Sequence, residues 1–374
     1  MGRLLIEALT LGGHAVRLAS DFRSFEGRGD PEIQARIAAA GRAEVDHLLQ
    51  TYQNTKPETL PEIWFTYHLY YKAPDHLGPV IARALNIPYV VAEPSYAPKR
   101  AGGLWNDGHR AVGEALAQAA AMLCLTRHDM ACVAPLIDAA GAPEERLRHL
   151  PPFLDATPYL AAGGQRTAAR QALAAQTALD PNKTWLIAVG MMRPGDKMES
   201  YRRLREALQH LVGDDWQLIT VGDGAMRDEV KALFDTLHVG GVDDVQRVVH
   251  LGAVDPEQMP ATLAAADIFV WPAAGEAYGM AMLEAQACGV PVVAGNIRGV
   301  PEVVQNARTG LLVAENDPIL FAQAIWRLMS DDDMTAEMRK AAQHFVKTER
   351  SVARAADILN QALKVAMDSA GGPP

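Results

Sequence analysis

Residues 271–304 read WPAAGEAYGMAMLEAQACGVPVVAGNIRGVPEVV. This stretch holds two carboxylates, Glu276 and Glu284, with seven residues between them and glycines on either side. Its apolar run over 280–288 predicts a helix, and 291–294 predicts a short strand. A helix that leads directly into an apolar strand is typical of a parallel α/β sheet. The stretch therefore predicts one repeat of such a sheet, with two acidic residues near the start of its helix.

The start of this helix is a candidate ligand site. Gly279 is predicted to begin the helix and Gly289 to end it. Eight helical residues span about 12 Å, so Glu276 in the loop and Glu284 inside the helix can both reach one ligand. The helix start offers unpaired N–H groups and a partial positive charge, which suit a phosphate. A carboxylate that accepts two hydrogen bonds suits a sugar or ribose diol.

The composition is that of a globular protein large enough for about two domains. Hydrophobic residues make up 49% and charged residues 21% of the 374 residues. No apolar run is long enough to predict a membrane span, and the first residues lack the features of a signal peptide. The net charge of −10 argues against nucleic acid as the main partner. Three cysteines without paired spacing predict buried thiols in a reducing compartment.

Strand and helix patterns alternate along the chain, which predicts parallel sheets covered on both faces. The predicted strands are 14–20, 63–70, 87–93, 121–126, 184–190, 216–224, 245–252, 266–272 and 290–295. The predicted helices include 31–52, 77–85 and 105–120, the last with Asn106 or Asp107 as N-cap. A proline-containing connection and lead-in helix occupy 149–183, and only helices are expected over 318–367.

The run E-A-Y-G-M-A-x-L-E-A-x-A-C-G-V-P-V-V-A, followed by G-V-P-E-V-V, resembles the signature of retaining glycosyltransferases of family 4. The resemblance extends over nearly the whole chain. It implies an α/β fold of the GT-B type, with two Rossmann-like doubly wound domains facing a central cleft. The implied domains are an acceptor-side domain at 1–160 and a nucleotide-sugar-binding domain at 161–344. Residues 345–374 would form a helix that crosses back to the first domain, followed by a tail.

The resemblance implies roles for the acidic stretch. Glu284 would hold the ribose hydroxyls of the donor, and Glu276 would lie at the donor sugar. Backbone N–H groups of Gly279, Met280 and Ala281 would hold the diphosphate. The implied donor is a nucleotide-diphosphate sugar, bound as a substrate rather than as a cofactor.

Two further segments of the second domain resemble family motifs. VGMMRPGDKMESY (189–201) is similar to a loop of the type G-R-x-x-x-x-K, in which the basic residues neutralise the donor diphosphate. Lys197 matches the lysine, whereas Met191 occupies the arginine position and Arg193 is the candidate substitute. The turn of Gly222, Asp223 and Gly224 is similar to the family's segment near the nucleotide.

No metal or other cofactor is expected from the resemblance. The acidic run SDDDM (330–334) is interpreted as charge at a helix start, with Ser330 or an aspartate as cap. Instead of a metal ion, Lys197, Arg193 and the helix start at Gly279 would neutralise the leaving diphosphate.

The first domain is expected to hold the acceptor, which the resemblance leaves open as a glycan, a lipid-linked molecule or a small molecule. His68 follows a predicted strand at a place where family members often carry a histidine. Glu93 occupies a second such place, where a histidine often faces the reacting sugar. Lys99 and Arg100 are interpreted as a solvated loop, with an acceptor or headgroup contact as the alternative. The expected location is the cytoplasm, with peripheral contact at the inner face of the membrane as an option.

The N-terminal sequence differs from the family pattern. Relatives begin with a short apolar strand and a glycine-rich loop, whereas this sequence begins at the helix that follows them. We expect a natural start roughly 20 residues upstream of Met1. The alternative is a shorter variant that lacks this strand.

Three interpretations of function remain open from the sequence. The first is a retaining transferase in which the leaving phosphate takes the acceptor proton and no side chain acts as nucleophile. The second is a nucleotide-sugar-binding or scaffold protein without turnover, which Met191 and Glu93 favour. The third is a GT-B sugar-nucleotide epimerase. The sequence lacks the dinucleotide-binding and P-loop glycine patterns, so a dehydrogenase or a P-loop enzyme is disfavoured.

Overall fold

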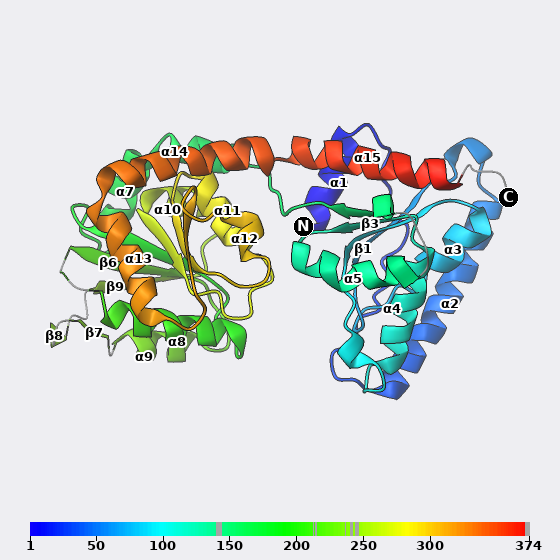
Figure 1. The fold of residues 1–374 in the computed structure, drawn as a ribbon, viewed down its shortest axis with the longest axis horizontal. Coiled ribbons are helices and arrows are strands. Elements are labelled where there is room, and N and C mark those ends of the chain that lie inside the picture. Colours follow the sequence, from blue (N-terminus) through cyan, green and yellow to red (C-terminus); the bar gives the residue numbers. More distant parts are fainter. Residues whose placement is uncertain are drawn as a thin grey trace. The chain divides into compact units, whose positions relative to one another are not determined.

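The computed structural model describes residues 1–139, 144–211, 213, 215–235, 237–239, 242–243 and 247–370. The chain divides into two compact units. The first contains Met1–Pro151 and the C-terminal segment from Val352, and the second contains Pro152–Ser351. Each unit has its own parallel sheet with helices packed around it (Figure 1).

The first unit is built on a four-stranded sheet in the order β1-β2-β3-β4. Its strands are β1 (Trp64–Leu69), β2 (Tyr89–Pro94), β3 (Ala121–Cys124) and β4 (Leu147–His149). Its helices are α1 (Gly2–Leu11), α2 (Pro31–Gln53), α3 (Gly78–Leu85), α4 (Asn106–Gln118), α5 (Arg127–Ala139) and α15 (Val352–Ala370), with short 3-10 turns η1 (Pro57–Thr59), η2 (Pro98–Arg100) and η3 (Glu144–Arg146). Val90, Val91 and Ala92 of β2 are fully buried, as expected for an inner strand covered on both faces.

The last helix of the chain belongs to the first unit. α15 packs against α1 and β3, and Figure 1 shows it running beside α1. The side chain of Asn360 joins the two helices, because its Nδ2 donates to the Gly12 carbonyl at 3.2 Å and its Oδ1 lies 2.8 Å from His14 Nε2. The first unit is therefore assembled from both ends of the chain.

The second unit is built on a six-stranded parallel sheet in the order β12-β11-β10-β5-β6-β9. Its strands are β5 (Thr184–Val189), β6 (Trp216–Val221), β9 (Val248–Gly252), β10 (Ile268–Trp271), β11 (Val292–Gly295) and β12 (Gly310–Val313), and β7 (His238–Val239) and β8 (Val242–Asp243) form a separate antiparallel pair. Its helices are α6 (Thr157–Gly163), α7 (Arg166–Gln176), α8 (Asp196–Gln209), α9 (Arg227–Asp235), α10 (Met259–Ala265), α11 (Met280–Ala287), α12 (Val300–Val303), α13 (Pro318–Ser330) and α14 (Asp332–Glu349).

The strand order of this sheet locates a ligand position. The chain starts at β5 in the middle, adds β6 and β9 on one side, and then returns to add β10, β11 and β12 on the other. The direction of winding therefore reverses between β5 and β10. In open parallel sheets, ligands bind at the carboxyl ends of the strands at such a reversal.

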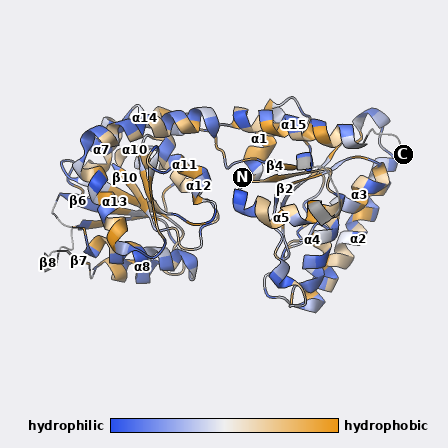
Figure 2. Ribbon diagram, in the orientation of Figure 1, coloured by the Kyte–Doolittle hydropathy of each residue, from blue (hydrophilic) through white to orange (hydrophobic). Residues whose placement is uncertain are grey.

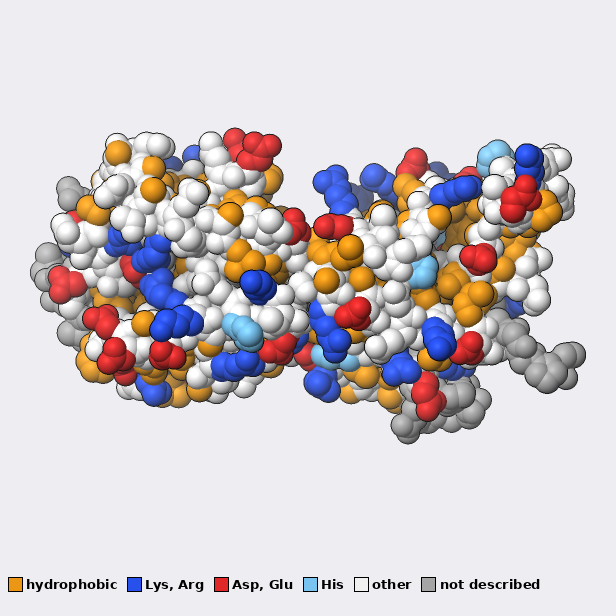
Figure 3. All heavy atoms as spheres, turned by 90° about the horizontal axis from the view of Figure 1, so that it is seen from above, with side chains coloured by type: hydrophobic (Ala, Val, Ile, Leu, Met, Phe, Trp, Pro, Cys, Tyr) orange, Lys and Arg blue, Asp and Glu red, His pale blue; other side chains and the backbone are white. Residues whose placement is uncertain are grey.

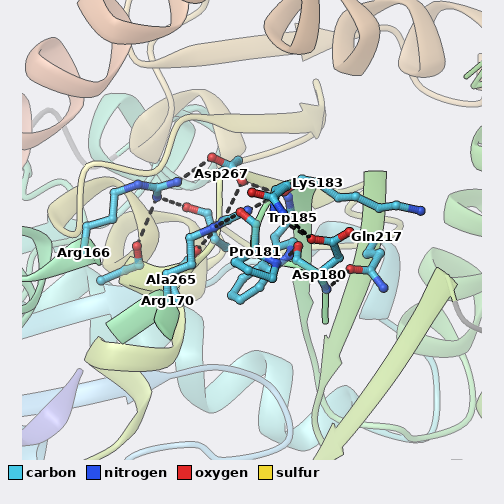
Figure 4. A network of polar contacts seen from close by, with 12 residues as sticks. Arg166, Arg170, Asp180, Pro181, Lys183, Trp185, Gln217, Ala265 and Asp267 are labelled. Atoms are coloured by element: carbon cyan, nitrogen blue, oxygen red, sulfur yellow. Dashed lines mark hydrogen bonds and ion pairs between the residues drawn. The ribbon is translucent and has the colours of Figure 1, made fainter. Parts of the chain in front are cut away.

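A polar network at the opposite, amino end holds β5 and β10 together (Figure 4). Asp267, just before β10, accepts hydrogen bonds from Arg166, from Arg170 at 2.9 Å and from the Trp185 N–H at 2.8 Å. Arg339 of α14 also donates to it at 3.3 Å. Burial lowers the pKa of Arg339 to about 10. The arginines donate to backbone carbonyls at the end of α10 as well, so this network ties α7, α10 and α14 to the sheet.

The strands of both sheets are largely hydrophobic, and the helices show alternating hydrophobic and hydrophilic stretches (Figure 2). Trp185, Trp216 and Trp271 are among the largest fully buried side chains of the second unit. On the face drawn in Figure 3, basic and acidic side chains are interspersed. Within the described residues, no helix combines the length and the apolar character that a membrane span requires.

Most predicted elements are confirmed, but residues 14–20 do not form a strand. A strand needs a neighbour to share its hydrogen bonds, and no strand of the described residues pairs with this segment. Val16 and Leu18 are 36% and 77% exposed there. The short strands β4 and β12 were not predicted. Positions 245 and 246 of another predicted strand lie outside the described residues, and β9 confirms its part from 248 to 252.

One predicted helix cap is wrong, and for a second the structure confirms the aspartate option. The N-cap of α4 is Trp105, without a side-chain capping bond. The prediction of Asn106 or Asp107 is wrong because Asn106 lies inside the helix, where its Oδ1 accepts from the Gly102 N–H at 2.8 Å. For the acidic run, Asp331 caps α14 and accepts from the Met334 N–H at 2.9 Å. Ser330 is not the cap, since it ends the preceding helix α13.

Candidate active site

The loops that follow β5 and β6 fit together through glycines. Gly222 and Gly224 have φ angles of 145° and 148°, which side-chain-bearing residues rarely adopt. A Cβ atom on Gly222 would lie 1.9 Å from the Gly190 carbonyl oxygen, and one on Gly224 would lie 2.3 Å from the Met192 carbonyl oxygen. The predicted turn thus has a structural reason for both of its glycines, namely the close approach of two backbones at the strand ends.

Asp223, between these glycines, contributes both its backbone and its side chain. Its carbonyl accepts the Met192 N–H at 2.9 Å. Its carboxylate accepts the Gly224 N–H at 2.7 Å and lies 3.6 Å from Arg227 Nη1. The side chain is about half exposed.

An ion pair spans the reversal point between β5 and β10. Lys197 lies in the first turn of α8, after β5, and Glu276 lies in the loop after β10. The Lys197 Nζ and Glu276 Oε2 atoms are 2.5 Å apart, with side chains only 17% and 15% exposed. Trp271 donates its indole N–H to the same oxygen at 3.2 Å, and its ring centroid lies 5.3 Å from Lys197 Nζ. The two predicted residues are therefore brought together and fixed by a third.

The loop that carries Glu276 has an unusual backbone. Ala273, Gly275 and Gly279 have φ angles of 62°, 62° and 82°. A Cβ atom on Gly275 would lie 2.1 Å from Asp196 Oδ2, so this loop packs closely against the start of α8. Gly279 is the N-cap of α11 and makes no side-chain capping bond. The predicted helix start is confirmed, and its first N–H groups have no capping side chain.

Glu284 lies on the same half-buried side of α11 as Met280 and Ala281, whereas Met282, Leu283 and the remainder of the helix are buried. Its carboxylate accepts a hydrogen bond from the hydroxyl of Tyr159 in α6. Burial raises the pKa of Glu284, and the hydrogen bond from Tyr159 opposes that rise. Burial and the nearby Glu284 carboxylate also raise the pKa of Tyr159.

Arg193 is placed differently from the other predicted donor residues. It is exposed in the loop between β5 and α8. Within the described part of the chain, its guanidinium makes no hydrogen bond or ion pair, and Met191 beside it is 56% exposed. The structure therefore brings Lys197 but not Arg193 to Glu276.

In the first unit, His68 and Glu93 meet at the carboxyl ends of β1 and β2. His68 Nδ1 lies 3.5 Å from Glu93 Oε1. Both residues have left-handed backbones, with φ of 64° and 55°, a conformation that costs non-glycine residues energy and often marks functional sites. Glu93 Oε2 is buried and has no hydrogen-bond partner among the described residues. His68 is 48% exposed, and its ring meets the Tyr70 ring edge-on at 4.7 Å.

Two residues of the second-unit site were missed by the sequence analysis. Trp271 stands in the stretch that predicts the site, and its position at a strand end was the available signal. Tyr159 lies far from Glu284 in the sequence, and no pattern connects the two. Both act on the predicted carboxylates by a hydrogen bond.

Part of this chain is similar to a known protein family. Residues 183–331, which contain the whole six-stranded sheet, match the family model described as "Glycosyl transferases group 1". These residues are similar to group 1 glycosyltransferases, and we call them the group 1 domain. The domain contains Lys197, Glu276, Glu284 and the glycine turn at 222–224, so the site described above lies inside it.

Curated relatives extend the similarity beyond the group 1 domain. The D-inositol 3-phosphate glycosyltransferase of Xylanimonas cellulosilytica is 27% identical over 315 residues, which are 81% of this chain and 73% of that protein. The protein of the same name from Salinispora tropica is 28% identical over 238 residues, 61% of this chain and 48% of that protein. The chain thus spans about half the length of the latter relative.

Solved structures show the fold of the group 1 domain together with the first unit. HepE of Anabaena in complex with UDP is similar with a TM-score of 0.66 at 19% identity, over 86% of this chain and 82% of that chain. WaaG, a glycosyltransferase involved in lipopolysaccharide biosynthesis, is similar with a TM-score of 0.62 at 17% identity, over 99% of this chain and 96% of that chain. The predicted GT-B fold is therefore confirmed.

Proposed function

We propose that this chain is a retaining glycosyltransferase that moves a sugar from a nucleotide-diphosphate sugar to a hydroxyl group of an acceptor. The observation that carries the proposal is the Lys197–Glu276 pair at the reversal point of the sheet, beside the uncapped start of α11. A buried cation next to free helical N–H groups is suited to a diphosphate. The HepE structures that hold UDP or UDP-glucose support a uridine nucleotide as the first donor to test.

Each donor residue has a chemical task in this proposal. Lys197 and the N–H groups at the start of α11 neutralise the charge that grows on the leaving diphosphate. Glu284 accepts hydrogen bonds from the ribose hydroxyls, and Glu276 accepts one from the donor sugar. Exposed Arg193 contacts the outer side of the diphosphate.

The acceptor side of the proposal rests on the first unit. His68 and Glu93 hold the acceptor hydroxyl, and the buried unpartnered oxygen of Glu93 accepts a hydrogen bond from it. The bond from the anomeric carbon to the diphosphate breaks as the acceptor oxygen attacks the same face, and the leaving phosphate oxygen takes the acceptor proton. No side chain forms a covalent intermediate, and no metal is needed.

Hydrolysis of UDP-glucose tests whether the chain binds and cleaves the donor, and the anomeric configuration of the product tests retention. We expect UDP release and an α-configured product from the α-configured donor, both followed by NMR. Lys197→Met should lower kcat by about 10²- to 10³-fold. Lys340→Met, which removes a 75% exposed lysine of the same unit, should leave kcat unchanged. An inverted product would contradict retention, and equal rates for the two variants would contradict the role of Lys197.

A nucleotide-sugar-binding protein without turnover is the second candidate, and the unengaged Arg193 favours it. Binding of UDP-glucose by calorimetry without any UDP release would support it over the transferase. Lack of binding to UDP or GDP sugars would contradict both.

A further inference from the structure

Four side chains form a cluster in the first unit that the proposed reaction does not use. Tyr71 and Lys72 follow β1, and Arg100 and Trp105 follow β2. The Arg100 guanidinium lies 4.8 Å from the Tyr71 ring centroid and 5.6 Å from that of Trp105. Lys72 Nζ lies 4.8 Å from the Trp105 ring centroid. We call these four residues the cation–aromatic cluster.

The two cations of the cluster lack an anionic partner within the described residues. Arg100 forms no ion pair, and its Nε atom is buried without a hydrogen-bond partner. Lys72 donates only to the Gly27 carbonyl, at 3.4 Å. A buried polar atom without a partner is costly and uncommon in native proteins. The cluster therefore has unused capacity to donate hydrogen bonds to an anion.

The carboxylate of Glu26, whose backbone contacts the cluster, already has hydrogen-bond partners. Glu26 is 6% exposed, and it accepts the backbone N–H groups of Arg28 and Gly29 at 2.5 and 2.6 Å. Its backbone touches the cluster, because its carbonyl accepts the Trp105 indole N–H at 3.3 Å and its N–H donates to the Lys72 carbonyl at 2.8 Å. The loop at Glu26 thus positions the cluster without neutralising it.

The cluster is continuous with the residues proposed to hold the acceptor. The His68 ring contacts Tyr70, whose ring centroid lies 5.8 Å from that of Tyr71. Tyr71 in turn contacts Trp105 at 5.6 Å. A row of rings therefore leads from the His68–Glu93 pair to the two cations, all at the carboxyl edge of one sheet.

We propose that the cation–aromatic cluster binds a phosphate ester carried by the acceptor. The assignment to the acceptor rests on the proposed transferase function, whereas the anion site itself does not. Stacking on aromatic faces fixes the plane of a guanidinium and leaves its N–H edge free for the paired hydrogen bonds that phosphate accepts. A neutral sugar would also stack on Trp105, but it would leave both positive charges without a partner.

Fluorine NMR of the full chain labelled with 5-fluorotryptophan tests the site without a donor. Trp105→Phe identifies the resonance of Trp105. We expect glucose 6-phosphate to shift this resonance saturably and glucose to leave it in place. Arg100→Gln should weaken the binding by about tenfold or more, and Lys72→Gln should weaken it as well. Arg110→Gln is the matched control, because Arg110 on neighbouring α4 is 69% exposed and lies 3.6 Å from Asp107.

A second arm distinguishes a soluble phosphate ester from a lipid phosphate. Leu104 beside the cluster is 65% exposed, so co-sedimentation is measured with phosphatidylglycerol vesicles and with neutral phosphatidylcholine vesicles. Sedimentation with the anionic vesicles alone, lost in Arg100→Gln, would assign the phosphate to a lipid headgroup. Equal shifts by glucose and glucose 6-phosphate, or no response to either the sugar phosphate or the vesicles, would overturn the site. Failure of sugar transfer alone would overturn the transferase and leave the anion site standing.

Discussion

The two units carry comparable charged pairs at the carboxyl edges of their sheets, but the pairs are built differently. In the second unit, Lys197 and Glu276 are 2.5 Å apart and both are largely buried. In the first unit, His68 and Glu93 are 3.5 Å apart, His68 is half exposed and one Glu93 oxygen has no partner among the described residues. In the second-unit pair both charged groups have a protein partner, whereas in the first-unit pair one buried carboxylate oxygen has none among the described residues.

The difference extends to what supports each pair. The second unit contains backbone contacts that only glycine permits at the carboxyl ends of β5 and β6, such as that of Gly222 with Gly190. The first-unit pair depends on non-glycine residues held at positive φ and on a row of aromatic rings. A site whose shape is set by backbone contacts has one geometry. Such a site suits a ligand group that does not vary, such as a nucleotide diphosphate. A site whose shape is set by side chains changes its shape and charge when those side chains are substituted. Such a site suits an acceptor that differs between relatives.

The largest effect is expected from adding one methyl group to the glycine turn. Gly222→Ala places a Cβ 1.9 Å from the Gly190 carbonyl oxygen at a φ of +145°, so the two strand ends must separate. We expect a loss of about 4 kcal/mol in the free energy of unfolding of the second unit, measured by urea denaturation. UDP binding should be lost with it.

Gly13→Ala in the first unit is the control for this comparison. Gly13 has a φ of +93° but open space around its Cβ position. Only backbone strain should therefore lower the free energy of unfolding, by about 1 kcal/mol. Equal losses for the two variants would show that the close contact at Gly222 has no special role.

A smaller effect is expected from the first-unit pair. Glu93→Gln keeps the size of the side chain but removes the charge next to His68. We expect kcat/KM for the acceptor to fall about tenfold, while UDP binding stays unchanged, because the residues that we propose to bind the donor belong to the other unit. Calorimetry with UDP and transfer kinetics separate the two readouts. A fall in UDP affinity would break the assignment of one substrate to each unit.

The sequence predicted the second unit better for a physical reason. Its strands are continuous apolar runs, and its site depends on glycines and carboxylates whose spacing is visible in the chain. The Gly222–Gly224 turn is an example, since the backbone approach that needs glycine leaves glycine in the sequence. Arg193 shows the limit, because a long arginine side chain two residues from the expected position could reach the predicted diphosphate site, but the sequence does not show where that side chain lies.

The features that the sequence did not predict depend on contacts between segments that are distant in sequence. Residues 14–20 have the pattern of a strand, yet a strand forms only beside a neighbour. The bond from Tyr159 to Glu284 and the stacking of Arg100 on Tyr71 leave no local signal. Both were therefore found only from the structure.

The smallest expected effect concerns Glu284, a proposed donor residue whose surroundings disfavour its charge. Burial raises its pKa and the Tyr159 hydroxyl opposes the rise. The folded state therefore holds a proton more readily than the unfolded state. The resulting stabilisation is complete below the unfolded pKa and is lost as the pH rises through the raised folded pKa. At neutral pH the ionised side chain thus lowers stability.

Glu284→Gln should accordingly raise the free energy of unfolding near pH 7, by less than about 1 kcal/mol, and should weaken UDP binding at the same time. The gain should vanish at about pH 3, where the wild-type side chain is protonated in both states because the pH is more than one unit below the unfolded pKa of about 4.3. Tyr159→Phe is the informative partner variant, because it removes the hydrogen bond that favours the ionised form of Glu284. The ionised Glu284 carboxylate should then lower the free energy of unfolding further. Urea denaturation at both pH values provides the measurement. A less stable Glu284→Gln near pH 7 would show that the carboxylate gains more from Tyr159 than burial takes away, and Glu284 would then match the internally satisfied Lys197–Glu276 pair.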